Sequence, residues 1–167
     1  MKTIAQYLRL ILFLGGILVG VQIPGFMNAY HNSLLAHLNE SEKSLGHFQK
    51  DADKYFNGNL DSLITHYKIN KDPVFTEGGK SIDLIYQRNL LLNKAFSDFN
   101  KNFFNAFVHV FIKPVKDIKK EVLKAYSYSL RLDKTSIIAG LLSGTILAGL
   151  PEIIFLIFFK FVKRNFY

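Results

Sequence analysis

The sequence predicts an all-α membrane protein in which two terminal transmembrane helices flank an extramembrane helical bundle. The two ends are strongly apolar, whereas residues 28–134 carry 16 of the 21 Lys and Arg and 12 of the 13 Asp and Glu. Apolar residues in this middle part recur every three or four positions, which is the period of a helix, and no run alternates as a strand does. The chain is therefore expected to consist of two membrane anchors and one water-facing helical domain, residues 28–135.

The first anchor is expected at residues 5–27. Gln22 is the one strongly polar side chain between Leu10 and Phe26, and the stretch reaches the ~20 residues that cross a bilayer. Pro24, followed by a glycine, predicts the end of this helix or a kink in it. The alternative is a cleaved signal peptide, but no convincing cleavage site follows, so a retained helix is favoured.

The second anchor is expected at residues 136–162, with residues 163–167 as a basic cytoplasmic tail. The stretch is almost wholly apolar, and cations at a helix end can reach the lipid headgroups. The basic residues that close it are Lys160, Lys163 and Arg164.

The orientation follows from the two short tails. Lys2 and Arg9 make the N-terminal tail basic, as the C-terminal tail is. Basic tails favour the cytoplasm, so both termini are predicted there and the middle domain on the opposite, periplasmic side. A Lys-rich run at residues 113–134 opposes this orientation, although long translocated loops are largely exempt from the rule.

Each anchor carries small residues at four-residue spacing, which lets two helix backbones approach closely in lipid. In the first anchor these are Gly16 and Gly20, and in the second they are Gly140, Gly144 and Ala148. The two anchors are therefore expected to pack through these positions.

Glu152 is the next position on the second stripe, and Arg9 lies close to the glycine face of the first anchor. Each is ~13–15 Å along its helix from the glycine pair, so antiparallel packing predicts similar depths and an ion pair or water-bridged contact. The alternatives are that Glu152 is protonated or seats a partner helix, that it faces lipid or the interface, or that it couples to proton or ion transport.

The middle domain is expected to contain two long helices, at about 28–56 and 81–113, that bury their apolar seams against each other as an antiparallel, coiled-coil-like pair. A short helix from about residue 60 and an exposed loop that extends to residue 79 join them. The first seam is Leu34, Leu38, Ser41, Leu45, Phe48, Ala52 and Tyr55. The second is Ile82, Ile85, Asn89, Leu92, Phe96, Phe99, Phe103, Ala106 and Val110.

A third helix is expected to begin at Pro114, because proline is favoured in a first turn. Its lysines beside a membrane span are expected to contact anionic lipid headgroups: Lys116, Lys119, Lys120 and Lys124. The net charge of +8 does not favour nucleic acid, because the basic residues are spread over the tails and the loop. The predicted partners are the lipid bilayer and protein, with no nucleic acid.

A second apolar face beyond the seam is formed by Phe104, Phe107 and Phe111. Packing against the third helix is the favoured interpretation. Contact with the membrane interface and binding in the groove of a partner protein are the alternatives.

The chain offers no pattern typical of an enzyme. It has no cysteine, so disulfides and thiolate sites are excluded. His37 and Glu40 share a helix face, but no zinc or di-iron motif is present. Residues 78–81 (Gly-Gly-Lys-Ser) end like a phosphate loop, yet Val74 stands where its first glycine should be. We predict no cofactor, no metal and no catalytic residue.

Several features occur in a recognisable order: residues 22–26 (Gln-Ile-Pro-Gly-Phe), a long helix through Phe48, residues 72–75 (Asp-Pro-Val-Phe), and a last helix that bears Glu152. This order resembles a family of uncharacterised bacterial inner-membrane proteins known as a domain of unknown function. The resemblance implies an envelope location and no activity.

We therefore expect a non-enzymatic membrane scaffold or accessory subunit of a bacterial envelope complex, acting through helix–helix interactions. Its partner would be a membrane or envelope protein, or further copies of the same chain. The alternative is a small transport-associated component that uses Glu152.

Overall fold

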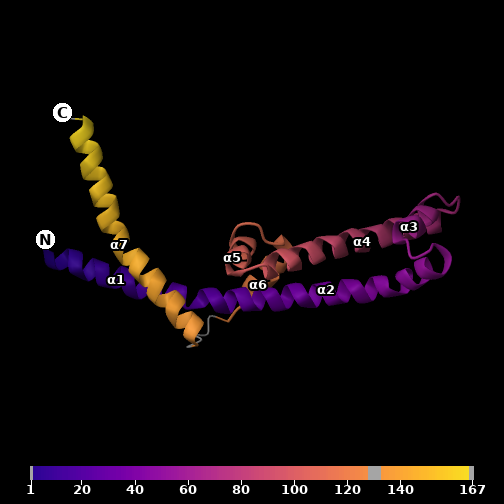
Figure 1. Cartoon of the computed structure of the whole chain (residues 1–167), viewed down its shortest axis with the longest axis horizontal. Helices are drawn as coiled ribbons and strands as arrows, with labels where there is room; N and C mark the ends of the chain where they lie inside the picture. The colour runs from indigo at the N-terminus through magenta and orange to yellow at the C-terminus, as the bar shows by residue number, and fades with distance from the viewer. Residues whose placement is uncertain (1, 128–132, 166–167) are drawn as a thin grey trace. The chain divides into compact units, whose positions relative to one another are not determined.

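The structure is a computed structural model that describes the backbone of residues 2–127 and 133–165 and the side chains of residues 4, 6–127 and 133–152. These residues form seven helices and no strand (Figure 1), which confirms the all-α class. The chain divides into two compact units. The terminal unit comprises Met1–Asn28 and Ala125–Tyr167, and the middle unit comprises Ala29–Lys124.

The terminal unit is built on α1 (Lys2–Gly20) and α7 (Lys134–Asn165), which pack against each other and cross in Figure 1. Both ends of the chain thus contribute a helix that is long and apolar enough to cross a membrane. The side chains of Lys160, Lys163 and Arg164, predicted to mark the end of the second anchor, lie outside the described residues.

The helix at the N-terminal end is interrupted close to Pro24, where the sequence predicts an end or a kink. α1 stops at Gly20, Val21 forms a turn, and α2 (Gln22–Tyr55) begins at once. Pro24 explains this position, because a proline has no N–H to donate to the carbonyl four residues earlier and its ring crowds that carbonyl. The break therefore falls one turn before Pro24, and the residues that follow it belong to α2.

In the middle unit, α2 runs alongside α4 (Pro73–Asn100), as Figure 1 shows. The ring of His31 in α2 contacts Phe99 near the end of α4. Farther along α2, Ala52 belongs to an apolar cluster with Ile82, near the start of α4. The two helices are therefore antiparallel, and α3 (Leu60–Lys68) contributes Leu60, Leu63 and Ile64 to the same cluster.

The second long helix begins earlier than expected, so the predicted exposed loop is partly wrong. Asp72 caps α4 by accepting a hydrogen bond of 2.8 Å from the backbone N–H of Val74, and a proline occupies the first turn. Gly79 is buried within this helix, where an added Cβ would lie 2.8 Å from the Cβ of Tyr67. The glycine thus permits α3 to pack closely on α4.

The same helix also ends earlier than expected. α4 stops at Asn100, and α5 (Phe103–Phe111) is a separate helix whose start is capped by Asn102, which accepts a hydrogen bond of 2.8 Å from the backbone N–H of Asn105. The break interrupts the predicted seam. Phe103 is 63% exposed, while Ala106 and Val110 are buried, and at the end of the first seam Tyr55 is exposed as well.

The last helix of the middle unit, α6 (Lys116–Ala125), begins two residues after the predicted start at Pro114. It buries Ile118 and Val122. A salt bridge between Asp117 and Arg88 links it to α4, and a hydrogen bond between Glu121 and His37 links it to α2. The buried apolar residues at this end of the unit are Tyr30, Leu34, Leu38, Leu92, Ala95, Ala106, Val110, Ile118 and Val122.

Candidate functional site

The crossing of α1 and α7 brings the two glycine stripes together. A Cβ built on Gly16 would lie 2.6 Å from the Cα of Gly144, and one built on Gly20 would lie 2.8 Å from the Cα of Gly140. Side-chain carbon atoms do not approach backbone atoms this closely in proteins, so only glycine fits at these positions. The backbones of the two helices are therefore in direct contact.

Ser143 joins the two helices by a hydrogen bond that sequence reasoning did not anticipate. Its hydroxyl donates to the backbone oxygen of Gly16 over 2.7 Å, and it also lies 2.9 Å from the backbone oxygen of Ala139 in its own helix. The sequence feature that could have indicated this bond is a hydroxyl residue beside a glycine in an apolar helix. This combination favours contacts between helices in lipid.

The structure places the side chains of Arg9 and Glu152 together. Nη2 of Arg9 donates a hydrogen bond to Oε1 of Glu152, and the two form an ion pair between α1 and α7. Ala148 and Arg9 also line a pocket of about 490 Å³ on this side of the crossing. Ala148 thus borders a hollow, whereas Gly144 is in backbone contact with α1.

The three phenylalanines of α5 do not form one uniform face. Phe107 and Phe111 are half-buried, with ring centroids 4.7 Å apart, whereas Phe104 is 72% exposed. Nζ of Lys119 lies 5.8 Å from the ring centroid of Phe111 and donates a hydrogen bond of 3.4 Å to its backbone oxygen. α6 therefore covers Phe111, and Phe104 points away from the core.

The four lysines predicted to contact lipid headgroups lie in different surroundings. Lys119 is half-buried against α5, whereas Lys116, Lys120 and Lys124 are exposed. Lys116 differs from the other two because it lines a cavity. Their contact with lipid stays a prediction.

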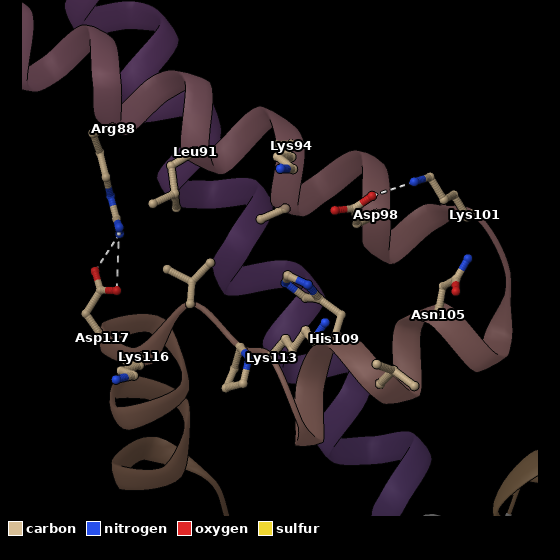
Figure 2. A pocket seen from close by; sticks show the side chains of 14 residues that line it. Arg88, Leu91, Lys94, Asp98, Lys101, Asn105, His109, Lys113, Lys116 and Asp117 are labelled. Atoms are coloured by element: carbon tan, nitrogen blue, oxygen red, sulfur yellow. Dashed lines mark hydrogen bonds and ion pairs between the residues drawn. The ribbon is translucent and has the colours of Figure 1, made fainter.

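This cavity, of about 680 Å³, was not foreseen from the sequence. Figure 2 shows it between α4, α5, the segment that follows α5, and the start of α6. Five cationic side chains line it: Arg88, Lys94, Lys101, Lys113 and Lys116. They come from three parts of the chain, and the fold gathers them around one hollow.

Two ion pairs in the cavity are visible as dashed lines in Figure 2. Arg88 pairs with Asp117 and Lys101 pairs with Asp98, each over 2.5 Å. The hydrogen bond from Lys101 lowers the pKa of Asp98. Burial opposes ionisation of Asp117, but the attraction of Arg88 and hydrogen bonds to the carboxylate leave its pKa below the ordinary value. Both carboxylates are therefore charged at neutral pH.

His109 lines the cavity and is held by Tyr30, a fully buried residue of α2. The Tyr30 hydroxyl accepts a hydrogen bond of 2.9 Å from the backbone N–H of Val115, and its oxygen is also hydrogen-bonded with Nε2 of His109, 3.1 Å away. Burial lowers the pKa of His109 and raises that of Tyr30. The lowered pKa favours the neutral form of His109 at neutral pH.

The histidine considered for metal binding has a different partner. Nε2 of His37 lies 2.8 Å from Oε2 of Glu121 in α6, and Glu40 does not take part. The hydrogen bond with His37 lowers the pKa of Glu121. Among the described residues, no group of three His, Asp or Glu side chains is placed to hold a metal ion.

Comparison with protein families matches residues 4–164 to a family described as "Protein of unknown function (DUF2937)". The match covers nearly the whole chain, and the chain belongs to this family. The expected resemblance to a domain of unknown function is thereby confirmed. Comparisons with curated proteins and with solved structures found no match.

Proposed function

We propose that this DUF2937 protein is a two-span integral protein of the bacterial inner membrane that acts as a non-enzymatic accessory subunit or scaffold. α1 and α7 form its anchor, both termini face the cytoplasm, and the middle unit faces the periplasm. The middle unit then presents a binding surface to a protein of the envelope.

The observation that carries this proposal is the outer surface of the two terminal helices. Only 17% of the apolar stretch of α7 and 39% of that at the N-terminal end are buried within the chain. Large apolar side chains point outward from both helices: Ile4, Leu8, Ile11, Leu14, Leu18, Ile138, Leu141, Leu142 and Ile146. Water is a poor solvent for such a surface, and lipid is a good one.

The contacts between α1 and α7 also support a lipid environment. Glycines in backbone contact and the hydroxyl of Ser143 bonded across the crossing are typical of helix pairs in lipid. An isolated carboxylate in a membrane costs roughly 2.5–3.5 kcal/mol on insertion scales, and pairing with Arg9 reduces the cost for Glu152. This partner favours a structural role for Glu152 over the transport alternative.

The scaffold part of the proposal rests on the surface of α5. Phe104 is 72% exposed and its neighbour Phe103 is 63% exposed, next to the covered Phe111. An aromatic pair left in water is a candidate anchor for a helix or groove of another protein. We place the partner contact there.

Two experiments on the full-length chain test this function. The protein should stay in membranes after alkaline carbonate washing and leave them only in detergent. Release by carbonate would contradict the anchor. In mild detergent, Phe104→Ser should abolish co-purification of a partner or of a second tagged copy, whereas Leu84→Ser, a substitution at a 73% exposed leucine of α4, should not.

A third variant tests the alternative that Glu152 takes part in transport. Glu152→Gln should leave the co-purification intact and should not alter proton or ion flux in proteoliposomes. Loss of a measured flux with assembly preserved would favour transport over the scaffold.

A further inference from the structure

The cavity between α4, α5 and α6 holds more positive charge than its own carboxylates offset. Five cations line it, and Asp98 and Asp117 are its two acids. Their ion pairs use Lys101 and Arg88. The remaining lysines, Lys94, Lys113 and Lys116, make no ion pair with any residue that the structure describes, and Figure 2 shows them around the same hollow.

The three lysines are exposed, so water weakens the repulsion between them. An anion placed in the hollow would be attracted by all three charges. A dianion offsets the excess better than a single carboxylate does, and lysine ammonium groups are common point-charge ligands of phosphate.

His109 adds a polar ring nitrogen to this cationic set. Its Nε2 is hydrogen-bonded with Tyr30, and its Nδ1 makes no hydrogen bond with a described residue. In the tautomer that carries its proton on Nδ1, this nitrogen would donate a hydrogen bond to an anion in the cavity.

The cavity also has an apolar wall and room for more than a single ion. Its volume of about 680 Å³ lies within the range of roughly 300–1,000 Å³ that small-molecule sites occupy. Leu91 faces it while 49% exposed, and Val108 and Val115 line it as well. These side chains would cover an apolar part of a ligand.

We propose that this cavity binds a phosphate monoester attached to an apolar group, with the phosphate on Lys94, Lys113 and Lys116 and the apolar group against Leu91 and Val108. Two sources carry this chemistry: the headgroup of an anionic phospholipid, and a water-soluble phosphorylated compound. The proposal stands on the middle unit alone and does not depend on whether the terminal helices cross a membrane.

Calorimetric titration of the full-length protein in a non-ionic detergent tests the site. Dihexanoyl phosphatidic acid represents the lipid source and phenyl phosphate the soluble source, and dihexanoyl phosphatidylcholine lacks the monoester. We expect saturable binding of at least one of the two monoesters and none of the phosphatidylcholine. Tighter binding of phosphatidic acid assigns a lipid, and tighter binding of phenyl phosphate assigns a soluble ligand.

Single substitutions separate this site from general attraction of anions to a basic protein. Lys94→Gln, Lys113→Gln and Lys116→Gln should each weaken binding about fivefold or more, the equivalent of one partly exposed charge contact. Lys120→Gln removes the same charge from the same helix as Lys116 but outside the cavity, and it should leave the affinity unchanged.

Two results would overturn the proposal. One is absence of saturable binding of either monoester to the wild-type protein. The other is an equal loss of affinity in Lys116→Gln and Lys120→Gln, which would mean that the net charge of the surface attracts the anion. Circular dichroism of each variant should match that of the wild type, because these lysines make no contact that the fold requires.

Discussion

The two units of this protein place the same residue types in opposite ways. In the middle unit leucines form part of the core, where Leu34 and Leu92 are 0% and 1% exposed. In the terminal unit leucines point outward, and Leu14 and Leu142 are 52% and 60% exposed. Glycines occupy the inside of the terminal pair instead. A core of large apolar side chains is what water selects, whereas a core of small residues beneath an apolar surface is what lipid selects.

The charged side chains show the same contrast. In the middle unit they lie on the surface, where ion pairs such as Arg88–Asp117 and Lys68–Asp83 join neighbouring helices. In the terminal pair the described ion pair is Arg9–Glu152, located at the helix contact. Arg9 and Glu152 are thus paired with each other, and in lipid such pairing would lower the cost of both charges.

The largest effect is expected from removing a leucine of the middle core. Leu34→Ala should lower the free energy of unfolding of the middle unit by about 2–5 kcal/mol, because it leaves a cavity at a fully buried site. Urea unfolding of the full-length protein in detergent, followed by circular dichroism, measures this change. Leu18→Ala, the same substitution at a 56% exposed position of α1, should leave the urea midpoint unchanged. Equal losses in both variants would contradict the contrast between the two units.

A smaller effect is expected at the crossing of the terminal helices. Gly16→Ala should destabilise the α1–α7 contact by about 1–3 kcal/mol, because its Cβ would overlap the backbone of Gly144. Gly15→Ala is the matched control, since no atom lies within 4 Å of a Cβ at that position. Energy transfer between labels on cysteines introduced at Ile11 and Ile146, during titration with SDS, reports separation of the helices. The same response in both variants would refute the crossing geometry.

The ion pair of the terminal helices should contribute less. Arg9→Glu and Glu152→Arg should each weaken the same contact by about 1–2 kcal/mol, the range of polar contacts between membrane helices. The double variant with the charges exchanged should recover most of the loss in the same SDS titration. If the exchange variant is no more stable than the two single variants, Arg9 and Glu152 do not act as a pair.

The smallest effect is expected from the titration of His109. Its pKa in the folded protein is lowered by burial from 6.5, although Asp98 raises it in part, so the unfolded chain binds the proton more readily. The resulting stability is complete above pH 6.5 and is lost as the pH falls through the lowered folded pKa. The melting temperature should thus fall less between pH 7.5 and 5.5 in His109→Gln, whose side-chain amide can still form a hydrogen bond with Tyr30. An identical fall in the two proteins would show that His109 is not the responsible group.

Composition and periodicity were sufficient to predict the helical class and the two long apolar helices at the ends of the chain. They did not locate the helix breaks, which depend on single residues. Pro24 interrupts the helix one turn before its own position, and Asn102 starts a new helix within a seam that continues on both sides of it. Asp72 converts a glycine-containing stretch, predicted as a loop, into the first turns of α4.

The cavity of the middle unit was beyond sequence reasoning for a different reason. Lys94, His109 and Lys116 belong to three helices, and their meeting depends on the break at Asn102, after which α5 packs back against α4. A single straight helix over residues 81–113, as the periodicity predicts, does not bring these side chains together. The contact positions at the glycine crossing could be predicted from the sequence, because a four-residue spacing places small residues on one helix face.

Cysteine accessibility in native membranes tests the membrane anchor most directly, and the chain contains no cysteine of its own that would react. The account predicts that Leu14→Cys and Leu142→Cys resist a water-soluble maleimide until the membrane is dissolved. Leu84→Cys in the middle unit should react in intact cells whose outer membrane has been permeabilised. The claim that the terminal helices anchor the protein in a membrane would be contradicted by one result. In that result, Leu14→Cys and Leu142→Cys react as fast as Leu84→Cys before detergent is added.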